Sequence, residues 1–431
     1  MTTLLRYVWC LLLLAATSAN CFAQTPRSAA FREKYKLKQV LVLSRHNIRS
    51  PLSGSESNLG RITPHQWFEW TSAPSELSLR GGMLETAMGQ FFRKWLAAEG
   101  MFAENHQPDA DEVYFYANSM QRTIATARYF AAGMMPAADL TIHHRYAPSK
   151  MDPIFTPQLT HIDRRFAAQA NLEATLLVGS HQLTAATLQL DSCYRILTDV
   201  LDWKESPLHQ AQPELRFDDE NQLMWEAGKE PAIKGSLKLA TAAADALVLQ
   251  YYESELPADA DFGHNIDRKA WEQIGKIKDV YTDLLFTTPT VAANVAHPLL
   301  VYMLDELCSS QRKFTFLCGH DSNIASVNAA LGVDYYELPD AIEKRTPIGC
   351  KLVFEKWRDR NGEEFVAVNL VYQSPEQLRN IELLNLNNPP MIFTLQLQEM
   401  QPNADGLYPF EEMKDRFDEA ISAYFHQAAG R

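Results

Sequence analysis

Two short segments of this 431-residue chain place histidine beside cationic or acidic side chains. Residues 45–51 read Arg-His-Asn-Ile-Arg-Ser-Pro, and residues 319–323 read Gly-His-Asp-Ser-Asn. A guanidinium group binds phosphate oxygens in a bidentate fashion, and two flanking arginines disfavour a charged imidazole. His46 therefore suits a neutral nucleophile facing a phosphate dianion held by Arg45 and Arg49. Taken alone, the segment could also form surface ion pairs around an incidental histidine.

The second segment lies between an apolar run and a predicted helix. Backbone N–H groups at a helix N-terminus attract anions, and His320 adds a further donor to a phosphate. Asp321 suits a general acid that protonates a leaving oxygen, although an aspartate at this turn can also simply cap the helix. Arg122, in the segment 118–123, follows a third apolar run; alone it would be interpreted as a solvated helix arginine.

The periodicity of apolar residues indicates the elements that must position these side chains. Buried strands are predicted over residues 39–43, 113–117, 314–318, 351–355 and 365–372. Helices are predicted over residues 78–99, 119–130 and 322–331, with Ser78 capping the first of them. Asn47 tolerates a left-handed backbone, which predicts a sharp bend directly after His46.

The outer thirds of the chain alternate strands and helices, whereas the middle is rich in Ala, Leu and Gln at helical spacing, as in residues 237–252 and 271–285. The predicted architecture is an α/β core domain formed by residues 24–150 and 310–431. A mostly helical substrate-side domain, residues 151–309, is inserted into it. Because ligands bind beyond the carboxyl ends of strands in open α/β sheets, the three charged strand ends should form one site.

The charge balance and the N-terminus limit the class of protein. With 40 Lys+Arg against 53 Asp+Glu, the net charge of -13 disfavours a nucleic-acid partner. Residues 1–23 have the pattern of a signal peptide, which predicts a periplasmic or secreted protein. The apolar run is too short for a spanning helix, so no stable membrane insertion is expected. Cys21 leaves a lipoprotein form open beside the free one.

Four cysteines remain after the predicted cleavage, and they allow three complete pairings among which the sequence does not choose. Cys318 lies in an apolar run and is expected to be a buried free thiol, while Cys193, Cys308 and Cys350 carry no such indication. The chain has no Cys-x-x-Cys pair and no His-Glu-x-x-His motif. No metal site and no cofactor are therefore predicted for this protein.

Taken together, these motifs resemble those of the histidine acid phosphatases, a family of the phosphoglycerate-mutase-like superfamily. The resemblance rests on Arg-His-x-x-Arg-x-Pro at 45–51, Gly-His-Asp at 319–321 and residues 116–123. Segments 63–70, 345–349 and 372–374 extend it over nearly the whole mature chain. It implies the phosphoglycerate-mutase-like α/β core with an inserted, mostly helical domain.

The resemblance also implies a role for each residue of the strand ends. His46 would form a phosphohistidine, and Asp321 would protonate the departing alcohol and then assist water. The phosphate oxygens would be bound by Arg45, Arg49, Arg122 and His320. The charge agrees with these roles, since three guanidiniums can supply what a metal ion supplies in other phosphoryl transfers.

Within the family, Asn47 and Ser322 resemble the bacterial periplasmic glucose-1-phosphatases, whereas many phytases carry Gly and Thr there. This similarity implies a small phosphate monoester as substrate, most simply glucose 1-phosphate, with Glu230 meeting the sugar and Leu52 beside the pocket. An acidic helical domain also disfavours a hexaphosphate. The disulfides of the enteric members are not transferred, because this chain lacks cysteine in those loops.

Three other functions remain as alternatives. A phytase would keep all the roles above and act on inositol hexakisphosphate. A mutase or phosphotransferase would pass the phosphoryl group to a sugar, but mutases of the superfamily carry their acid on a separate glutamate. A non-enzymatic phosphate-binding protein would need a broken site, and no expected residue is missing. The sequence does not fix the oligomeric state.

Overall fold

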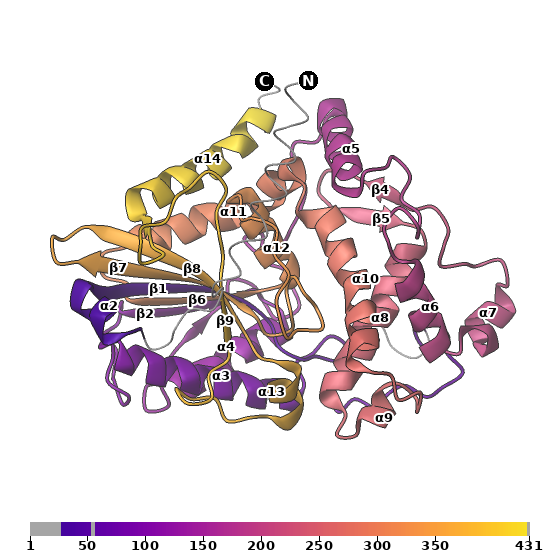
Figure 1. Ribbon diagram of the computed structural model, residues 1–431, viewed down its shortest axis with the longest axis horizontal. Helices are drawn as coiled ribbons and strands as arrows, with labels where there is room; N and C mark the ends of the chain where they lie inside the picture. Colours follow the sequence, from indigo (N-terminus) through magenta and orange to yellow (C-terminus); the bar gives the residue numbers. More distant parts are fainter. Residues whose placement is uncertain (1–26, 53–56, 429–431) are drawn as a thin grey trace.

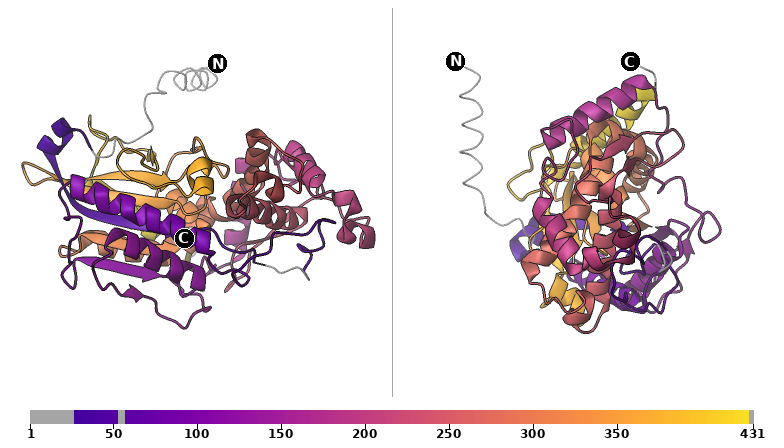
Figure 2. Two further views of the ribbon diagram at one scale, coloured as in Figure 1. Left: turned by 90° about the horizontal axis from the view of Figure 1, so that it is seen from below. Right: turned by 90° about the vertical axis from the view of Figure 1, so that its right-hand side faces the viewer.

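The computed structural model describes residues 27–52 and 57–428. The predicted signal peptide, residues 1–23, lies outside the described residues. A helix-covered sheet and a mostly helical part lie side by side (Figures 1 and 2), as expected for an α/β core with a helical insertion. The boundaries assigned to the two domains from the sequence stay a prediction.

The central sheet is mixed, and its parallel half carries the strand ends of interest. Its strands are β1 (Tyr35–Arg45), β2 (Val113–Ala117), β3 (Ile142–His143), β6 (Phe314–Gly319), β7 (Lys351–Asp359), β8 (Glu364–Tyr372), β9 (Met391–Thr394) and β10 (Tyr408–Pro409). The order is β10-β8-β7-β1-β6-β2-β3, and β9 pairs with β8. Strands β1, β6, β2 and β3 are parallel, while β7 runs antiparallel to β1 and β8. All five strands predicted from apolar runs are confirmed.

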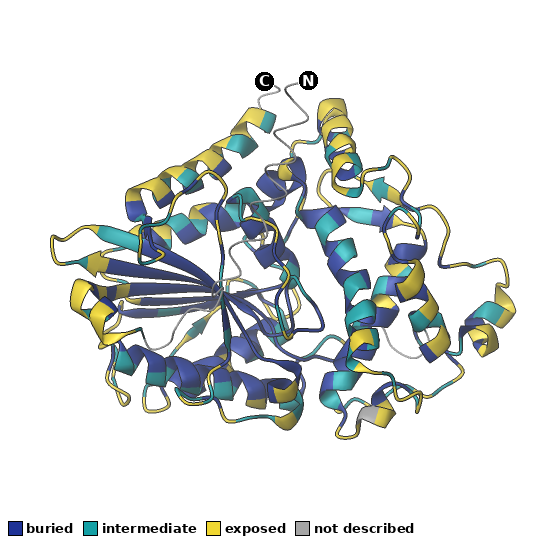
Figure 3. Ribbon diagram, viewed as in Figure 1, coloured by how far each residue is buried: buried dark blue, intermediate teal, exposed yellow. Residues whose placement is uncertain are grey.

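Helices cover both faces of the sheet, which explains why its strands read as unbroken apolar runs. The covering helices are α3 (Leu79–Ala98), α4 (Gln121–Met134), α11 (Pro289–Cys308), α12 (Asp321–Ala330) and α14 (Phe410–Ala428). Val40 and Val42 pack with residues of α3 and α4, whereas Leu41 and Leu43 pack with residues of α11, α12 and α14. The sheet between these layers is almost entirely buried (Figure 3).

Helix α3 shows how the local sequence sets an element that borders the site. Ser78 caps it as predicted, because its Oγ accepts a hydrogen bond from the backbone N–H of Gly81 at 3.0 Å. Its apolar stripe, including Leu84, Met88 and Phe91, is buried. The helix ends just before Gly100, whose φ of +75° lies in the left-handed region that terminates helices.

The helical part contains α5 (Arg164–Val178), α6 (Asp191–Val200), the 3-10 turn η1 (Trp203–Glu205), α7 (Pro207–Ala211), α8 (Ser236–Glu253), α9 (Pro257–Ala260) and α10 (Arg268–Phe286). A small hairpin of β4 (Gln222–Met224) and β5 (Ala232–Lys234) lies beside them. The short helix α2 (Ala29–Lys34) leads into β1, and the short helix α13 (Pro375–Asn380) contacts α8. The helices predicted over residues 237–252 and 271–285 are confirmed as α8 and α10.

Helix α11 connects the two parts. It follows α10 at a bend of 84°, and the bent pair has the length and composition of a broken membrane span. No single helix in the described ranges is long and apolar enough to cross a membrane. Leu299, Leu300 and Met303 in its second half belong to the apolar cluster of the sheet. The carboxyl-terminal half of α11 therefore packs as part of the core, although its residues precede the predicted boundary at 309.

The four cysteines of the predicted mature chain are all free thiols in this structure. Cys193, Cys318 and Cys350 are buried, and Cys308 is exposed. The expectation of a buried free thiol at Cys318 is confirmed.

A fully buried ion pair supports the turn that follows β1. Lys351 Nζ lies 2.8 Å from Glu85 Oε1, and neither side chain is exposed to solvent. The same carboxylate oxygen accepts a hydrogen bond from Asn47 Nδ2 at 2.8 Å. Asn47 Oδ1 in turn accepts from the backbone N–H of Ile48 at 2.8 Å. Helix α3, strand β7 and the turn after His46 are thus joined by one polar group in the interior.

We expect Lys351→Met to lower the free energy of unfolding by about 3–5 kcal/mol, because it leaves a buried carboxylate without its counter-charge. The double variant Glu85→Leu/Lys351→Met removes both charges and should cost less than the single substitution. Urea unfolding followed by circular dichroism measures both. A single variant as stable as the wild type would contradict the role given to this pair.

Candidate active site

The carboxyl ends of β1, β6 and β2 meet at one edge of the sheet. Arg45, the last residue of β1, is in register with Gly319, the last residue of β6. The backbone N–H of His46 donates to the carbonyl of Gly319 at 3.2 Å, and that of Asn118 donates to the carbonyl of Cys318 at 2.9 Å. The three charged segments therefore leave the sheet side by side, as the parallel arrangement predicts.

His46 is a buried, neutral imidazole. Burial and then the positive charge of Arg122 hold its pKa well below the usual range. Its Nδ1 lies 2.9 Å from the backbone carbonyl oxygen of Asn47. Because a carbonyl oxygen only accepts, Nδ1 carries the proton and Nε2 keeps its lone pair. This tautomer leaves a nucleophilic nitrogen at the strand end.

His320 faces His46, with ring centroids 5.5 Å apart and planes at 71°. Burial and the charge of Arg122 lower its pKa to about 3. Asn118 Nδ2 lies 2.7 Å from its Nε2. The amide is fixed in this sense because Asn118 Oδ1 accepts from the backbone N–H of Asp152 at 2.9 Å. Asn118, which the sequence reasoning did not assign to the site, thus orients the second histidine.

Three guanidiniums surround the two rings, and their positive charge is only partly balanced. Arg45 Nη1 lies 2.7 Å from a carboxylate oxygen of Glu343, and Arg49 Nη2 lies 2.8 Å from one of Asp245. Arg122 makes no ion pair and no side-chain hydrogen bond with the other described residues, and burial and then Arg49 lower its pKa to about 10. In all three arginines the buried Nε has no hydrogen-bond partner in the described chain. Such surplus donors and charge fit an anion with several oxygens.

Asp321 is the first residue of α12, and the capping position belongs to His320. Its Oδ2 lies 3.1 Å from Lys278 Nζ and 3.7 Å from Arg45 Nη2. Burial favours the neutral acid, but Lys278 and Arg45 outweigh it and hold the pKa of Asp321 well below its usual range. Asp321 is consequently a carboxylate when no ligand occupies the site.

Lys278, on α10 in the helical part, joins the acidic groups of the site. Its Nζ lies 2.7 Å from Asp245 Oδ1 and 3.3 Å from Glu343 Oε1, in addition to Asp321. Sequence reasoning missed Lys278 itself and two of its three partners, Asp245 and Glu343. Asp245 carried one signal, since it is an isolated acid in the apolar run of α8, and such an acid is seldom buried without a partner. Lys278 and Glu343 carried none.

The structure places the two remaining candidates differently. Glu230 is exposed just before β5, and its pKa is raised by partial exclusion of water and by the negative charge of Asp321, while Arg122 opposes the shift. It therefore lies near the strand-end residues. Leu52 is 62% exposed and borders the undescribed residues 53–56, so no contact to the pocket supports it.

One detail of the turn differs from expectation. Asn47 is absent from the residues with positive φ in the described chain, so the left-handed bend predicted after His46 is wrong. Asn47 shapes the turn through its side chain, which bonds Glu85 and the N–H of Ile48. Hydrogen bonding of the amide replaces the backbone conformation that its residue type suggested.

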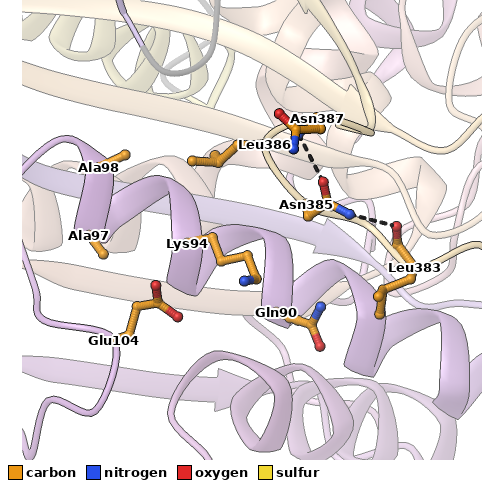
Figure 4. A pocket seen from close by; sticks show the side chains of 9 residues that line it. All are labelled: Gln90, Lys94, Ala97, Ala98, Glu104, Leu383, Asn385, Leu386 and Asn387. Atoms are coloured by element: carbon orange, nitrogen blue, oxygen red, sulfur yellow. Dashed lines mark hydrogen bonds between the residues drawn. The ribbon is translucent and has the colours of Figure 1, made fainter.

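A separate pocket of about 690 Å³ lies between α3 and residues 383–387 (Figure 4). Its lining includes Lys94 and Glu104 but none of the residues described above. The chemistry of the strand ends therefore identifies the candidate active site better than the size of a pocket does.

A family model described as the histidine phosphatase superfamily (branch 2) matches residues 36–373. The chain belongs to this branch. A curated glucose-1-phosphatase from Salmonella typhimurium is 38% identical to this histidine phosphatase, over 96% of this chain and 98% of its own length. A second, from Providencia rettgeri, is 37% identical over 97% of this chain and 100% of its own length. The structure of Hafnia alvei phytase in complex with myo-inositol hexakis sulphate matches with a TM-score of 0.80 at 28% identity, covering 90% of this chain and 98% of that one. The protein is therefore a phosphoric monoester hydrolase.

Because the pKa of His320 is lowered in the folded state, the free energy of unfolding of this histidine phosphatase depends on pH. The unfolded chain binds a proton at His320 below pH 6.5, whereas the folded chain does so only near pH 3. The free energy of unfolding should therefore fall as the pH drops through this window, by about 1.4 kcal/mol per pH unit from this residue. His320→Asn should show a correspondingly shallower pH dependence in urea unfolding without phosphate. The exposed His181→Asn is the control, and a slope unchanged by His320→Asn would contradict the assignment.

Proposed function

We propose that this protein is an exported histidine acid phosphatase that hydrolyses small sugar phosphates, glucose 1-phosphate above all, through a phosphohistidine on His46. The observation that carries the proposal is the neutral imidazole of His46, with its Nε2 lone pair free among three arginines. A nucleophile that is neutral and surrounded by positive charge matches an incoming phosphate dianion.

In the proposed first step, Nε2 of His46 attacks the phosphorus atom and the bond from phosphorus to the ester oxygen breaks. The leaving oxygen takes a proton from Asp321, so that an alcohol departs. In the second step, water attacks the phosphohistidine and gives its proton to Asp321, which releases inorganic phosphate and restores the imidazole. Arg45, Arg49 and Arg122 bind the oxygens that carry negative charge in both steps.

Asp321 must be protonated for the first step, although it is ionised in the free site. A phosphate monoester at acidic pH is a monoanion, because its second pKa is near 6. Its remaining proton can pass to Asp321 once the dianion is held by the arginines. The bound negative charge then opposes the effect of Lys278 and favours the protonated acid. This coupling supports an acid phosphatase.

Two observations favour a sugar monophosphate over inositol hexakisphosphate. The relatives at 37% and 38% identity are glucose-1-phosphatases, whereas a phytase of Escherichia coli is 28% identical. Above its raised pKa, Glu230 adds a negative charge near Asp321 and Arg122, and this charge repels a second phosphate group on a highly charged ring. The phytase reading keeps support from Hafnia alvei phytase, whose structure holds an inositol hexakis sulphate in the same fold.

The proposal is tested by phosphate release from purified protein in EDTA at about pH 5. We expect a higher kcat/KM for glucose 1-phosphate than for inositol hexakisphosphate, and Glu230→Gln should narrow this difference. His46→Ala should lower kcat by more than about 10⁴-fold while the fold is kept. Preference for the hexakisphosphate would place the protein with the phytases, and transfer of phosphate to added glucose in place of water would indicate a phosphotransferase.

Removing Lys278 should raise the pKa of Asp321, since its ammonium group is the strongest stabiliser of the carboxylate. In Lys278→Met we expect the alkaline limb of kcat to move to higher pH, because the acid stays protonated further. The measurement uses kcat, which reports groups in the enzyme–substrate complex. Lys269→Met, which replaces an exposed lysine on the same helix, is the matched control. An alkaline limb that does not move would show that Asp321 is not the acid.

A further inference from the structure

Three side chains from distant segments converge on one point of the helical part. His65 follows the turn after β1, Asp202 lies between α6 and η1, and His264 lies between α9 and α10. His65 Nε2 is 2.6 Å from Asp202 Oδ2, and His264 Nε2 is 3.2 Å from the same oxygen. One donor atom from each residue lies within 4.8 Å of the other two.

The two imidazoles are held in place by their surroundings. The ring of His65 stacks on Phe262 with centroids 4.8 Å apart and planes at 16°. Trp67 packs edge-on against Phe262, with ring centroids 5.4 Å apart and planes at 80°. His264 meets His65 nearly at a right angle, at 83°. The rings therefore present Nε2 atoms from two directions toward a single carboxylate.

We propose that His65, Asp202 and His264 form a binding site for a divalent transition-metal ion of the zinc type. Imidazole nitrogen and carboxylate oxygen are the ligands such ions take in proteins, and three of them leave a fourth position for water. Ligand atoms around tetrahedral zinc lie about 3.3 Å apart, so small side-chain rotations convert the present contacts into a coordination shell.

The chemistry of the three groups supports an ion over a purely hydrogen-bonded cluster. Neutral imidazoles and an ionised carboxylate are the forms that bind metal, and the Nε2 atoms of both histidines already lie within 3.2 Å of Asp202 Oδ2. The three side chains are each about one-third exposed, at 33%, 35% and 31%, which leaves a path for an ion. The ion would link the segment that follows the first catalytic motif to two helices of the helical part.

This site is distinct from the phosphate site. None of its residues contacts the strand-end histidines, arginines or Asp321 in the described structure. Its role is accordingly structural: it fixes the segment bearing Trp67 against α6 and the start of α10. Occupancy should raise thermal stability without entering the chemical steps.

The test is titration of EDTA-treated, full-length mature protein with Zn²⁺ by calorimetry at about pH 7.5, followed by Co²⁺ substitution and its absorption spectrum. We expect one ion per chain at this site, a tetrahedral Co²⁺ spectrum and a higher midpoint of thermal unfolding with Zn²⁺. Affinity should fall at about pH 5, since protonated imidazoles do not bind metal.

Asp202→Asn is the decisive variant, because an amide keeps hydrogen bonds to both histidines but loses the carboxylate charge. It and His65→Gln should weaken binding by at least about ten-fold and abolish the thermal shift, while phosphatase activity without metal shows that both are folded. The exposed His181→Gln should bind like the wild type. Zn²⁺ binding that is unchanged in Asp202→Asn and His65→Gln, or absent from the wild type, would overturn the proposal, whatever substrate the phosphatase prefers.

Discussion

The constraint on which the rest of the site depends is the confinement of positive charge around one neutral imidazole. Two guanidiniums, those of Arg45 and Arg49, and two histidines are buried at the same sheet edge, and Arg122 is half-buried beside them. Each cation withdrawn from water carries a desolvation cost. Glu343 and Asp245 neutralise Arg45 and Arg49, but Arg122 has no acidic partner in the described chain. Burial and the surplus positive charge together keep both imidazoles neutral, and the charge of Arg122 favours an anionic substrate.

This balance is assembled by both parts of the fold. The parallel strands bring Arg45, His320 and Arg122 together without help, because their carboxyl ends coincide at one edge. The helical part then supplies Asp245 and Lys278, which pair with an arginine and with the carboxylates of the sheet side. The helical part therefore contributes charged residues to the site, in addition to any contact with the leaving group of the substrate. A displacement of α8 or α10 would change the charge state of the strand-end residues themselves.

The parts of the molecule that could be predicted from sequence are the strands and motifs that are determined by residues contiguous in the chain. The strands show as apolar runs because helices cover both sheet faces, and the motifs at their ends keep their spacing whatever the rest of the chain does. The roles of Lys278 and Glu343 in the site depend only on tertiary contacts. The sequence around a helical lysine does not indicate that three carboxylates will contact it in the folded chain. The bend expected at Asn47 was wrong for the same reason: Glu85, a residue remote in sequence, determines what its side chain does.

The ionised state of Asp321 in the free site gives the proposed reaction its order of events. A carboxylic acid that is already protonated in the free enzyme could donate its proton as soon as substrate binds. Asp321, in contrast, is stabilised as a carboxylate by Lys278 and Arg45 until the negative charge of a bound phosphate offsets the effect of these cations. Binding of the anion and protonation of the acid are thus two sides of one charge balance. Under the proposed mechanism, Asp321 stays ionised when a ligand without a phosphate group binds, so it cannot act as the acid. The site therefore selects substrates by their charge before it selects them by the shape of the sugar.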